Sequence, residues 1–421
     1  MREGVELRVL GGCGETGRVG FEVKFGKTEP MILDFGVKRK LLTKERDEIY
    51  PMLPEENPIF VYLSHFHQDH SGSIPLLLKN FKRIDFLCSN PTFDIFDSYV
   101  MAWYKTAVEY GIPVDENAYQ NFTKRNLRRL DLDGISDPHF SLLMGKSGHV
   151  VGSTWLWVDV DGFKTLYTGD LCPDSPIFKY EDPPKADLLI LDTAYGVERM
   201  MGKDEITDFV VRKLEEFDRV ILPLPRLGRS QEIVHMLFKR GDCEPLGIHL
   251  DRKIAESTKL TFRYVQWLKL ERLDDEFIQF LERMRVVESP EDLEGKGLYL
   301  LSDGMMSGGL SKMALVKFME DPRTAFILTG RQEEGTPGWK ILMDEGMKKR
   351  VFQLIWKVHP DVSDIVDIIE KVEPTHVVPF HCSKKCTEDT INLLSGRFKK
   401  TVFHSLNVGD RLYIEKIGRF D

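Results

Sequence analysis

Short apolar runs rich in β-branched residues recur along the chain, and they end in polar or glycine-rich loops. Residues 58–64 (PIFVYLS) and 186–196 (ADLLILDTAYG) are typical of buried strands, whereas residues 203–217 have a helical pattern. Residues 153–170 favour a hairpin, because the Asp-Gly pair at 161–162 is a strong signal for a two-residue turn. Strands that alternate with helices predict an α/β fold.

The length of 421 residues is too great for one ordinary core and predicts two or three domains. Longer helical patterns lie around residues 91–110 and 255–285, and no internal repeat, low-complexity segment or Pro/Ser-rich linker separates parts of the chain. We therefore expect a second domain to be inserted into the first or docked tightly on it.

The composition excludes several classes of function. Hydrophobic residues make up 42% and charged residues 30%, which is the balance of a globular protein. A net charge of −9 gives no global basic field, although local patches decide nucleic-acid binding. No apolar run reaches the roughly 18 residues of a membrane span, and the first residues (MREGVELRVLGG) lack a signal-peptide core. The expectation is a cytoplasmic protein with no membrane partner.

Six cysteines are scattered through the chain, and in an intracellular protein of this size reduced thiols are expected rather than disulfides. Cys382 and Cys386 form a C-x3-C pair. One such pair without a second is a weak zinc signal, so a structural role is favoured for both thiols.

The stretch LSHFHQDHSGSIP at residues 63–75 places His65, His67, Asp69 and His70 within six positions of a chain with 11 histidines. It is either a solvated polar loop or half of a metal site. Zinc-type divalent ions prefer imidazole nitrogen and carboxylate oxygen, usually four ligands per ion. His65 and His67 can point the same way in an extended loop, while Asp69 and His70 could serve an adjacent ion. Such a site needs further ligands elsewhere in the chain.

Three later segments offer those ligands. His149 in SGHVVGS lies just before a predicted strand, while Asp170 in LYTGDL and His381 in VVPFHC each end one. The two carboxylate oxygens of Asp170 could bridge two ions. Functional residues are common at strand ends in α/β folds, so the metal-site interpretation is favoured over the polar loop.

The motifs H-x-H-x-D-H, G-H-x-x-G-S and T-G-D, in this order and in this context of strands, resemble the metallo-β-lactamase superfamily. Asp34 in MILDFG resembles the first motif of that superfamily. The resemblance implies that the Asp34 carboxylate supports the metal loop without binding metal.

Later segments resemble the β-CASP nucleases, a group that includes the endonuclease subunit of the polyadenylation cleavage factor, its archaeal relatives and ribonuclease J. The segments are LLILDTAYG, LPRLGRSQE, LLSDGMMSGGLS, EEGTPGWKIL, KVHPDVSDI and VVPFHC. By this resemblance Asp192 is the motif A acid, His359 the motif B histidine and His381 the motif C histidine.

The resemblance also implies the architecture. Residues 1–195 and 346–421 would form a metallo-β-lactamase αββα sandwich, and residues 196–345 an inserted α/β β-CASP domain.

The expected chemistry is hydrolysis of a phosphodiester by a hydroxide activated between two zinc ions. One ion would be held by His65, His67 and His149, and the other by Asp69, His70 and His381, with Asp170 bridging. Asp69 therefore counts among the catalytic residues. His359 would meet the developing charge and donate a proton to the leaving oxygen, and Asp192 would orient its ring. A satisfied loop histidine is the alternative for His359.

Substrate contacts are expected in glycine- and serine-rich loops. Ser307 and Gly308 in DGMMSGGLS could cradle a phosphate, and Arg229 in LPRLGRSQE could contact it. Asp303 adds a negative charge beside that loop. The RNA-processing branch of the family has a histidine at motif C, which the Artemis-like DNA branch usually lacks. His381 therefore favours RNA over DNA. Single-stranded RNA is the expected partner.

Other functions are also compatible with the sequence. The chain could be a catalytically weak RNA-binding scaffold, a DNA nuclease of the same family or a small-molecule hydrolase of the superfamily. Endonucleolytic and 5′–3′ exonucleolytic cleavage are both compatible with the sequence. So are a homodimer and membership of an RNA-processing or decay complex.

Overall fold

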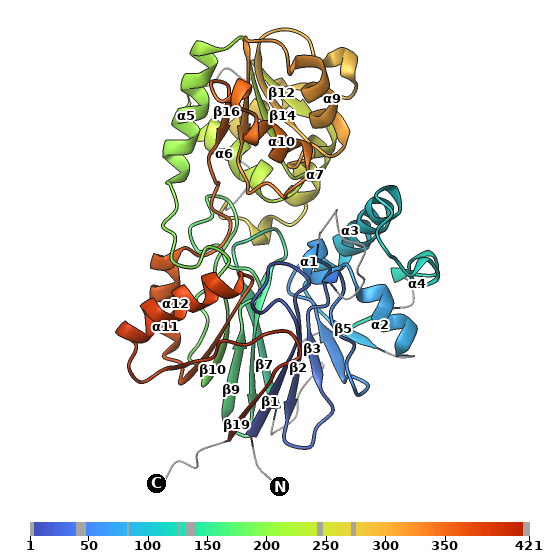
Figure 1. Ribbon diagram of the computed structural model, residues 1–421, viewed down its shortest axis with the longest axis vertical. Coiled ribbons are helices and arrows are strands. Elements are labelled where there is room, and N and C mark those ends of the chain that lie inside the picture. The colour runs from blue at the N-terminus through green and yellow to red at the C-terminus, as the bar shows by residue number, and fades with distance from the viewer. Residues whose placement is uncertain are drawn as a thin grey trace. The chain divides into compact units, whose positions relative to one another are not determined.

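The computed structural model describes residues 4–38, 48–81, 84–124, 127–130, 140–241, 247–270 and 275–415 (Figure 1). The chain divides into two compact units. Unit 1 comprises Met1–Pro173, Tyr180–Arg199 and His359–Asp421, and unit 2 comprises Asp174–Lys179 and Met200–Val358. Both contain strands and helices, which confirms the predicted α/β class.

Unit 1 contains two sheets. The first has seven strands in the order β19-β1-β2-β3-β4-β5-β6. They span Gly4–Gly11 (β1), Gly20–Phe25 (β2), Met31–Leu33 (β3), Phe60–Tyr62 (β4), Asp85–Leu87 (β5), Arg128–Leu130 (β6) and Arg411–Glu415 (β19). The second has six strands in the order β18-β17-β10-β9-β8-β7. They span Phe140–Lys146 (β7), Thr154–Val160 (β8), Phe163–Tyr167 (β9), Leu188–Asp192 (β10), His376–Phe380 (β17) and Val402–Phe403 (β18).

The two sheets of unit 1 share one apolar core. Phe21 of the first sheet meets Tyr167 and Phe380 of the second edge-on, with ring centroids 5.8 and 5.5 Å apart. On the outer face of the second sheet, Ile365 and Leu394 pack in a cluster with Leu189. These two residues belong to α11 (Val362–Val372) and α12 (Lys384–Arg397).

The remaining helices of unit 1 accompany the first sheet. They are α1 (Gln68–Ser71), α2 (Ile74–Asn80), α3 (Asn90–Glu109) and α4 (Glu116–Gln120). Phe96 of α3 stacks on Phe86 of β5. The result is the predicted αββα sandwich.

Unit 2 is built on a third sheet, whose six strands are all parallel and follow the order β13-β12-β14-β11-β15-β16. They span Arg219–Pro223 (β11), Ile248–Asp251 (β12), Arg285–Val287 (β13), Gly297–Leu301 (β14), Thr324–Leu328 (β15) and Val351–Gln353 (β16). Alternate residues of β11 enter different apolar clusters, Val220 and Leu222 one cluster and Ile221 the other. Both faces of the sheet are therefore covered, as parallel sheets require.

The helices of unit 2 divide between these two clusters. One cluster contains residues from α5 (Lys203–Glu216), α6 (Arg229–Arg240), α7 (Arg252–Phe262) and α8 (Asp275–Arg283). The other contains residues from α9 (Gly309–Phe318) and α10 (Pro337–Met343). Short 3-10 helices lie at Val265–Trp267, Pro290–Asp292 and Glu345–Met347.

Local sequence signals explain several of these elements. Asp161 and Gly162 have positive φ angles of 50° and 83° and join β8 to β9, as a two-residue type I′ turn requires. The helical pattern at 203–217 forms α5. The pattern around 255–285 corresponds to α7 and α8 with a 3-10 turn between them, and residues 271–274 lie outside the described part.

The boundary of the inserted unit differs from the expected one. The sequence places the return to the first domain at residue 346, but unit 2 extends to Val358. The reason is that β16 pairs with β15, with Val351 opposite Phe326. Unit 2 also includes Asp174–Lys179, which the sequence places in the first domain.

A buried carboxylate ties the segment Asp174–Lys179 into unit 2. Ser175 Oγ donates to Glu232 Oε1 at 2.5 Å, and Trp356 Nε1 donates to Glu232 Oε2 at 2.6 Å. Lys203 Nζ lies 3.2 Å from the same Oε2. Glu232 is 1% exposed, so these partners compensate a charge that has left water.

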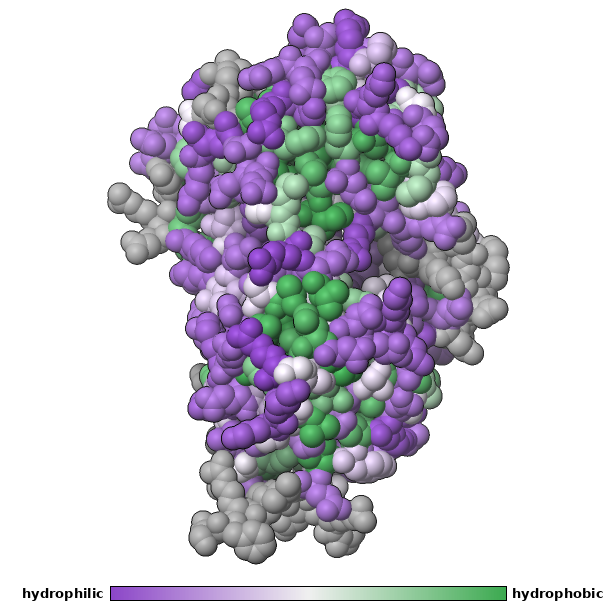
Figure 2. All heavy atoms as spheres, turned by 60° about the vertical axis from the view of Figure 1, so that its left-hand side comes forward, coloured by the Kyte–Doolittle hydropathy of each residue, from purple (hydrophilic) through white to green (hydrophobic). Residues whose placement is uncertain are grey.

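One face of the molecule carries mainly polar side chains. Figure 2 shows hydrophilic side chains over much of one face, with smaller apolar patches among them. Among the described residues, no helix is both long and apolar enough to cross a membrane.

Strand direction gathers the ends of several strands at one edge of each sheet in unit 1. In the first sheet β4 is parallel to β3 and β5, and in the second β10 is parallel to β9 and β17. The loops that follow these strands carry most of the predicted metal ligands, whereas His149 follows β7.

Acid should destabilise unit 2 through His235, which is 2% exposed in its core. Burial, with a smaller effect from Lys239, lowers the pKa of His235 to about 4. Between pH 6.5 and 4 the unfolded chain binds a proton that the folded chain does not, so stability falls as the pH falls. At pH 5 this loss is about 2 kcal/mol. The free energy of unfolding, measured with urea, should fall between pH 7.5 and pH 5.0 in both proteins. We expect this fall to be about 1–2 kcal/mol smaller in His235→Leu than in the parent chain. Equal losses in both proteins would contradict the assignment.

Candidate metal centre

The loop after β4 is held by backbone contacts with residues 35–37. Phe35 N donates to His70 O at 2.8 Å, and Val37 N donates to Gln68 O at 2.9 Å. Gly36 lies between them, so close to this loop that a methyl group there would overlap the Asp69 carbonyl. The loop can approach this segment only because residue 36 has no side chain.

Asp34 organises the loop through its carboxylate, which is fully buried. Oδ1 accepts from Ser64 N at 2.7 Å, and Oδ2 accepts from Ser64 Oγ at 2.6 Å and Tyr167 Oη at 2.5 Å. Oδ2 also accepts from His70 Nδ1 at 2.7 Å. This bond places the proton on Nδ1 and leaves Nε2 of His70 as the ligand atom.

The same network fixes His65. Because the Ser64 hydroxyl donates to Asp34, its oxygen accepts from His65 Nδ1, 3.0 Å away. His65 Nε2 therefore carries the lone pair that can bind metal.

Four ligand atoms form a first group, contributed by His65, His67, His149 and Asp170. His67 Nδ1 lies 3.0 Å from His65 Nε2 and 3.1 Å from His149 Nε2. Asp170 Oδ2 lies 3.5 Å from each of those two Nε2 atoms. A tetrahedron with zinc–ligand bonds of about 2.0–2.1 Å has edges of about 3.3–3.4 Å. The group therefore fits a tetrahedral divalent ion.

A second group is contributed by Asp69, His70 and His381. His381 Nε2 lies 3.2 Å from Asp69 Oδ2, and His70 Nε2 lies 3.2 Å from Asp170 Oδ1. His70 Nε2 and Asp170 Oδ1 are both buried, and neither makes a hydrogen bond within the described part of the chain. A cation between the two groups would satisfy both atoms. All seven predicted ligands thus lie close together; Asp170 belongs to the first group and forms a third possible group with His359 and His381.

The pKa values show what charge the centre attracts. Burial lowers the pKa of His65 and lowers that of His67 to about 4, so both rings are neutral. Burial opposes the charged form of His381 as well, but the Asp170 charge and the bond to Asp69 raise its pKa to about 10. The Asp170 charge likewise raises the pKa of His70 against the effect of burial. The carboxylates thus favour positive charge in the centre, and bound divalent ions would supply it.

His359 and Asp192 lie beside these groups. His359 Nδ1 donates to Asp192 Oδ2 at 2.9 Å, and Asp192 also accepts from Leu171 N and Ala194 N. The His359 ring lies 5.0 Å from the His149 ring and 5.1 Å from the His381 ring. Tyr195 meets it edge-on at 5.5 Å. The ring is held on several sides and belongs to the centre rather than to a remote loop.

Several known proteins are similar to this chain in sequence or in structure. The Beta-Casp domain family matches residues 231–341. An RNase J-like protein of Methanocaldococcus jannaschii is 26% identical over 410 residues, which cover 90% of this chain and 92% of that protein. The resemblance to the β-CASP family is confirmed.

Other proteins similar to this chain are larger or less similar in sequence. Cleavage and polyadenylation specificity factor subunit 3 of Dictyostelium discoideum is 24% identical over 421 residues, which cover 90% of this chain and 53% of that protein. The chain thus spans about half the length of that relative. A crystal structure of a protein of unknown function from Enterococcus faecalis V583 has a TM-score of 0.61 at 16% identity, covering 98% of this chain and 100% of the other, and shows the fold alone.

The predicted phosphate-binding residues lie in unit 2. The Ser307 hydroxyl is buried and has no hydrogen-bond partner among the described residues. Gly308 is the N-cap of α9, and Arg229 is the first residue of α6. However, Asp303 Oδ1 accepts from Met305 N and Ser307 N. An internal carboxylate therefore already uses two backbone donors of the loop proposed for phosphate.

Some residues of the candidate metal centre are not predicted from the sequence. Ser64 and Tyr167 donate to Asp34, and Gly36 allows the close approach of the metal loop. A signal existed for each, since Ser64 directly precedes His65, Tyr167 precedes the T-G-D motif and Gly36 ends the segment MILDFG. Sequence patterns do not show which polar atoms face one carboxylate.

The described cysteines are all free thiols, and Cys243 lies outside the described residues. None of the candidate metal groups found in the described part includes a cysteine. The hydrogen bond from Cys386, which outweighs burial, lowers the pKa of Cys382 to about 6.

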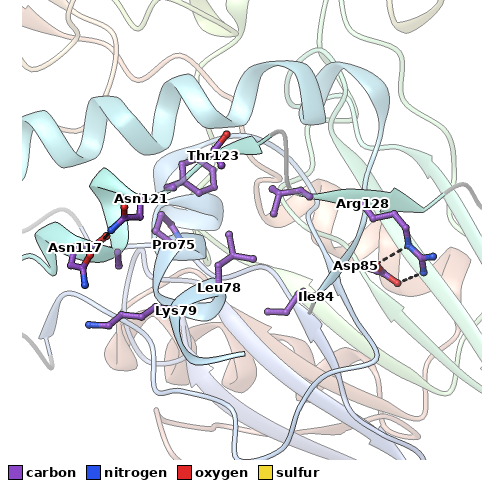
Figure 3. A pocket seen from close by; sticks show the side chains of 12 residues that line it. Pro75, Leu78, Lys79, Ile84, Asp85, Asn117, Asn121, Thr123 and Arg128 are labelled. Carbon is purple, nitrogen blue, oxygen red and sulfur yellow. Dashed lines mark hydrogen bonds and ion pairs between the residues drawn. The ribbon is translucent and has the colours of Figure 1, made fainter. Parts of the chain in front are cut away.

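A separate cavity of about 600 Å³ lies in unit 1 (Figure 3). It is lined by residues of α2, α4, β5 and β6 and their connections, and by none of the candidate metal ligands. Its charged residues are internally paired, Lys79 with Asp115 and Arg128 with Asp85.

Gly36→Ala should weaken metal binding without removing a ligand. The added methyl group would push the Asp69 carbonyl and move Asp69 and His70, so we expect a loss of about 10- to 100-fold in zinc affinity. Zinc retained after dialysis against a chelator series measures the effect. Gly396→Ala in α12 is the matched control, because a methyl group there meets nothing within 4 Å. Equal zinc retention by the two variants would show that the close approach does not matter.

Proposed function

We propose that this chain is a zinc-dependent ribonuclease that hydrolyses RNA phosphodiester bonds. The observation that carries the proposal is that seven metal-type ligands lie in adjacent groups, with the His359–Asp192 pair at 2.9 Å beside them. The name of the M. jannaschii relative, RNase J-like protein, supports the same reaction.

The ligand groups suggest how two zinc ions would be held. His65, His67 and His149 would hold one ion and Asp69, His70 and His381 the other, with Asp170 contributing an oxygen to each. When bound, the two ions would supply an activated water as nucleophile and positive charge for the transition state.

The protein's own groups would then position and move protons. Asp192 accepts from His359 Nδ1 and so orients the ring, and a proton carried on Nε2 as well would pass from there to the leaving oxygen. Asp192 is fully buried and takes two further backbone donors, so its charge is stabilised and its position fixed. Asp34 likewise accepts from His70 Nδ1 and orients the ring of His70.

RNA is the proposed substrate, single-stranded RNA in particular. The motif C histidine, His381, favours the RNA-processing branch of the family. The D. discoideum relative carries the name of a cleavage and polyadenylation factor, which fits work in an RNA-processing or decay complex. Ser307, Gly308 and Arg229 are the proposed phosphate contacts in unit 2, and Asp303 restricts that role to the donors it does not already engage.

Metal analysis combined with a cleavage assay tests the proposal. We expect about two zinc ions per purified chain, cleavage of RNA, and little cleavage of DNA with the same sequence. Chelation should abolish cleavage and zinc should restore it. Clearly less than two zinc ions with no cleavage would favour an RNA-binding scaffold, and preferential cleavage of DNA would favour a DNA nuclease.

His359→Ala should lower the cleavage rate by about 10²- to 10⁴-fold, the usual contribution of a positioned acid–base group. Asp192→Asn should reduce the rate by a smaller factor, because it only perturbs the orientation of that ring. Both variants should retain the zinc content of the parent. His404→Ala is the control, since His404 contacts His376 and none of the candidate ligands. Full activity of His359→Ala would exclude the proton-donor role.

End-labelled RNA distinguishes the two modes of cleavage. Substrates with a 5′-phosphate or a 5′-triphosphate are incubated with the chain, and the product ladders are compared. Mononucleotides released only from the 5′-phosphate form would indicate exonuclease action. Internal fragments from both forms would indicate an endonuclease.

A further inference from the structure

Two thiols lie next to the metal centre and have no part in the proposed reaction. Cys382 directly follows His381, and Cys386 lies in the first turn of α12. The thiols of Cys382 and Cys386 are hydrogen-bonded to each other. Both side chains also border the turn that begins at Thr193, since Cys382 Sγ lies 3.4 Å from Thr193 Oγ1 and a methyl group at Gly196 would overlap Cys386 Sγ.

The surroundings of the two thiols differ. Cys382 is 1% exposed, and its Sγ lies 3.4 Å from Thr193 Oγ1 and 3.2 Å from Thr387 Oγ1. Cys386 is partly exposed to solvent. Cys386 is therefore the more accessible of the two residues to an oxidant in solution, and Cys382 is held in place by its contacts with the two threonines.

The fold leaves space for the Cys386 sulfur. Gly196 has a φ of 54°, and a methyl group at that position would overlap Cys386 Sγ. A third thiol, Cys13, lies nearby, but it is buried and donates to the Pro379 carbonyl at 3.6 Å. The exposed partner for Cys382 is therefore Cys386 rather than Cys13.

We propose that Cys382 and Cys386 form an oxidation site that closes to a disulfide in response to peroxides. The Cys386 sulfur attacks one oxygen of hydrogen peroxide, which breaks the O–O bond and gives a sulfenic acid and water. The Cys382 sulfur then attacks Cys386 Sγ, an S–S bond forms, and the sulfenic oxygen leaves as a second water with the remaining thiol proton. Two thiols are oxidised and one peroxide is reduced.

Closure should act on the metal centre, an effect that rests on the proposed function. His381 has a left-handed backbone with φ of 71°, and its N–H donates to Gly12 O at 2.8 Å. A covalent link at the next residue constrains the loop that aims His381 at Asp69. We expect the disulfide to weaken retention of the ion held by Asp69, His70 and His381.

Peptide mapping tests the oxidation site without using activity. Trypsin cleaves after Lys384 and Lys385, so the disulfide would join two separate peptides, residues 372–384 and 386–397. After treatment of the zinc-loaded full chain with hydrogen peroxide and blocking of free thiols, we expect this linked pair, and its loss with dithiothreitol. Oxidation of Cys386 without linkage, or linkage of Cys382 to the peptide of residues 9–18 that contains Cys13, would overturn the proposal.

Zinc release tests the coupling to the centre. Peroxide should release about half of the bound zinc from the parent chain, as measured with a zinc indicator, and dithiothreitol should reverse the loss. Cys386→Ser should retain its zinc in peroxide, whereas Cys88→Ser, which removes the buried thiol that follows β5, should behave like the parent. A linked pair with full zinc retention would refute the coupling. A linked pair in a chain that never binds zinc would count against the proposed function and leave the oxidation site standing.

Discussion

The metal centre depends on one buried charge, the carboxylate of Asp170. It is 2% exposed, and its two oxygens face different histidines, Oδ2 toward His65 and His149 and Oδ1 toward His70. A carboxylate removed from water is costly unless donors or cations surround it. The histidines that converge from separate loops compensate this charge, and the same convergence creates two adjacent groups of ligands.

Two further buried carboxylates are also surrounded by hydrogen-bond donors, and both contact histidines of the centre. Asp34 follows β3 and Asp192 ends β10, and both are fully buried. Each accepts several hydrogen bonds, including one from the Nδ1 atom of a histidine that points into the centre, His70 for Asp34 and His359 for Asp192. The sheets therefore supply rigid positions for carboxylates, and the carboxylates in turn orient imidazole rings. This arrangement explains why the loops that carry the candidate ligands lie at the ends of buried strands.

The sequence was most informative where one local signal decides the outcome. The Asp-Gly turn at 161–162 and the spacing of His65, His67 and His70 are properties of a few neighbouring residues. The end of unit 2 was placed too early, because the assignment of β16 depends on its pairing with β15, and three residues carry little pattern of their own. Similarly, the occupation of the loop after β14 by Asp303 depends on side-chain direction, which spacing does not reveal.

The chain passes between its two units four times, at 173/174, 179/180, 199/200 and 358/359. Unit 2 is therefore formed by two separate segments of the chain. A fragment of residues 200–358 would contain every strand of the third sheet, yet it would lack Ser175 and leave the buried Glu232 with one donor fewer. Chimeras that exchange this unit between family members should therefore carry residues 174–179 together with the insert, since these six residues complete its interior.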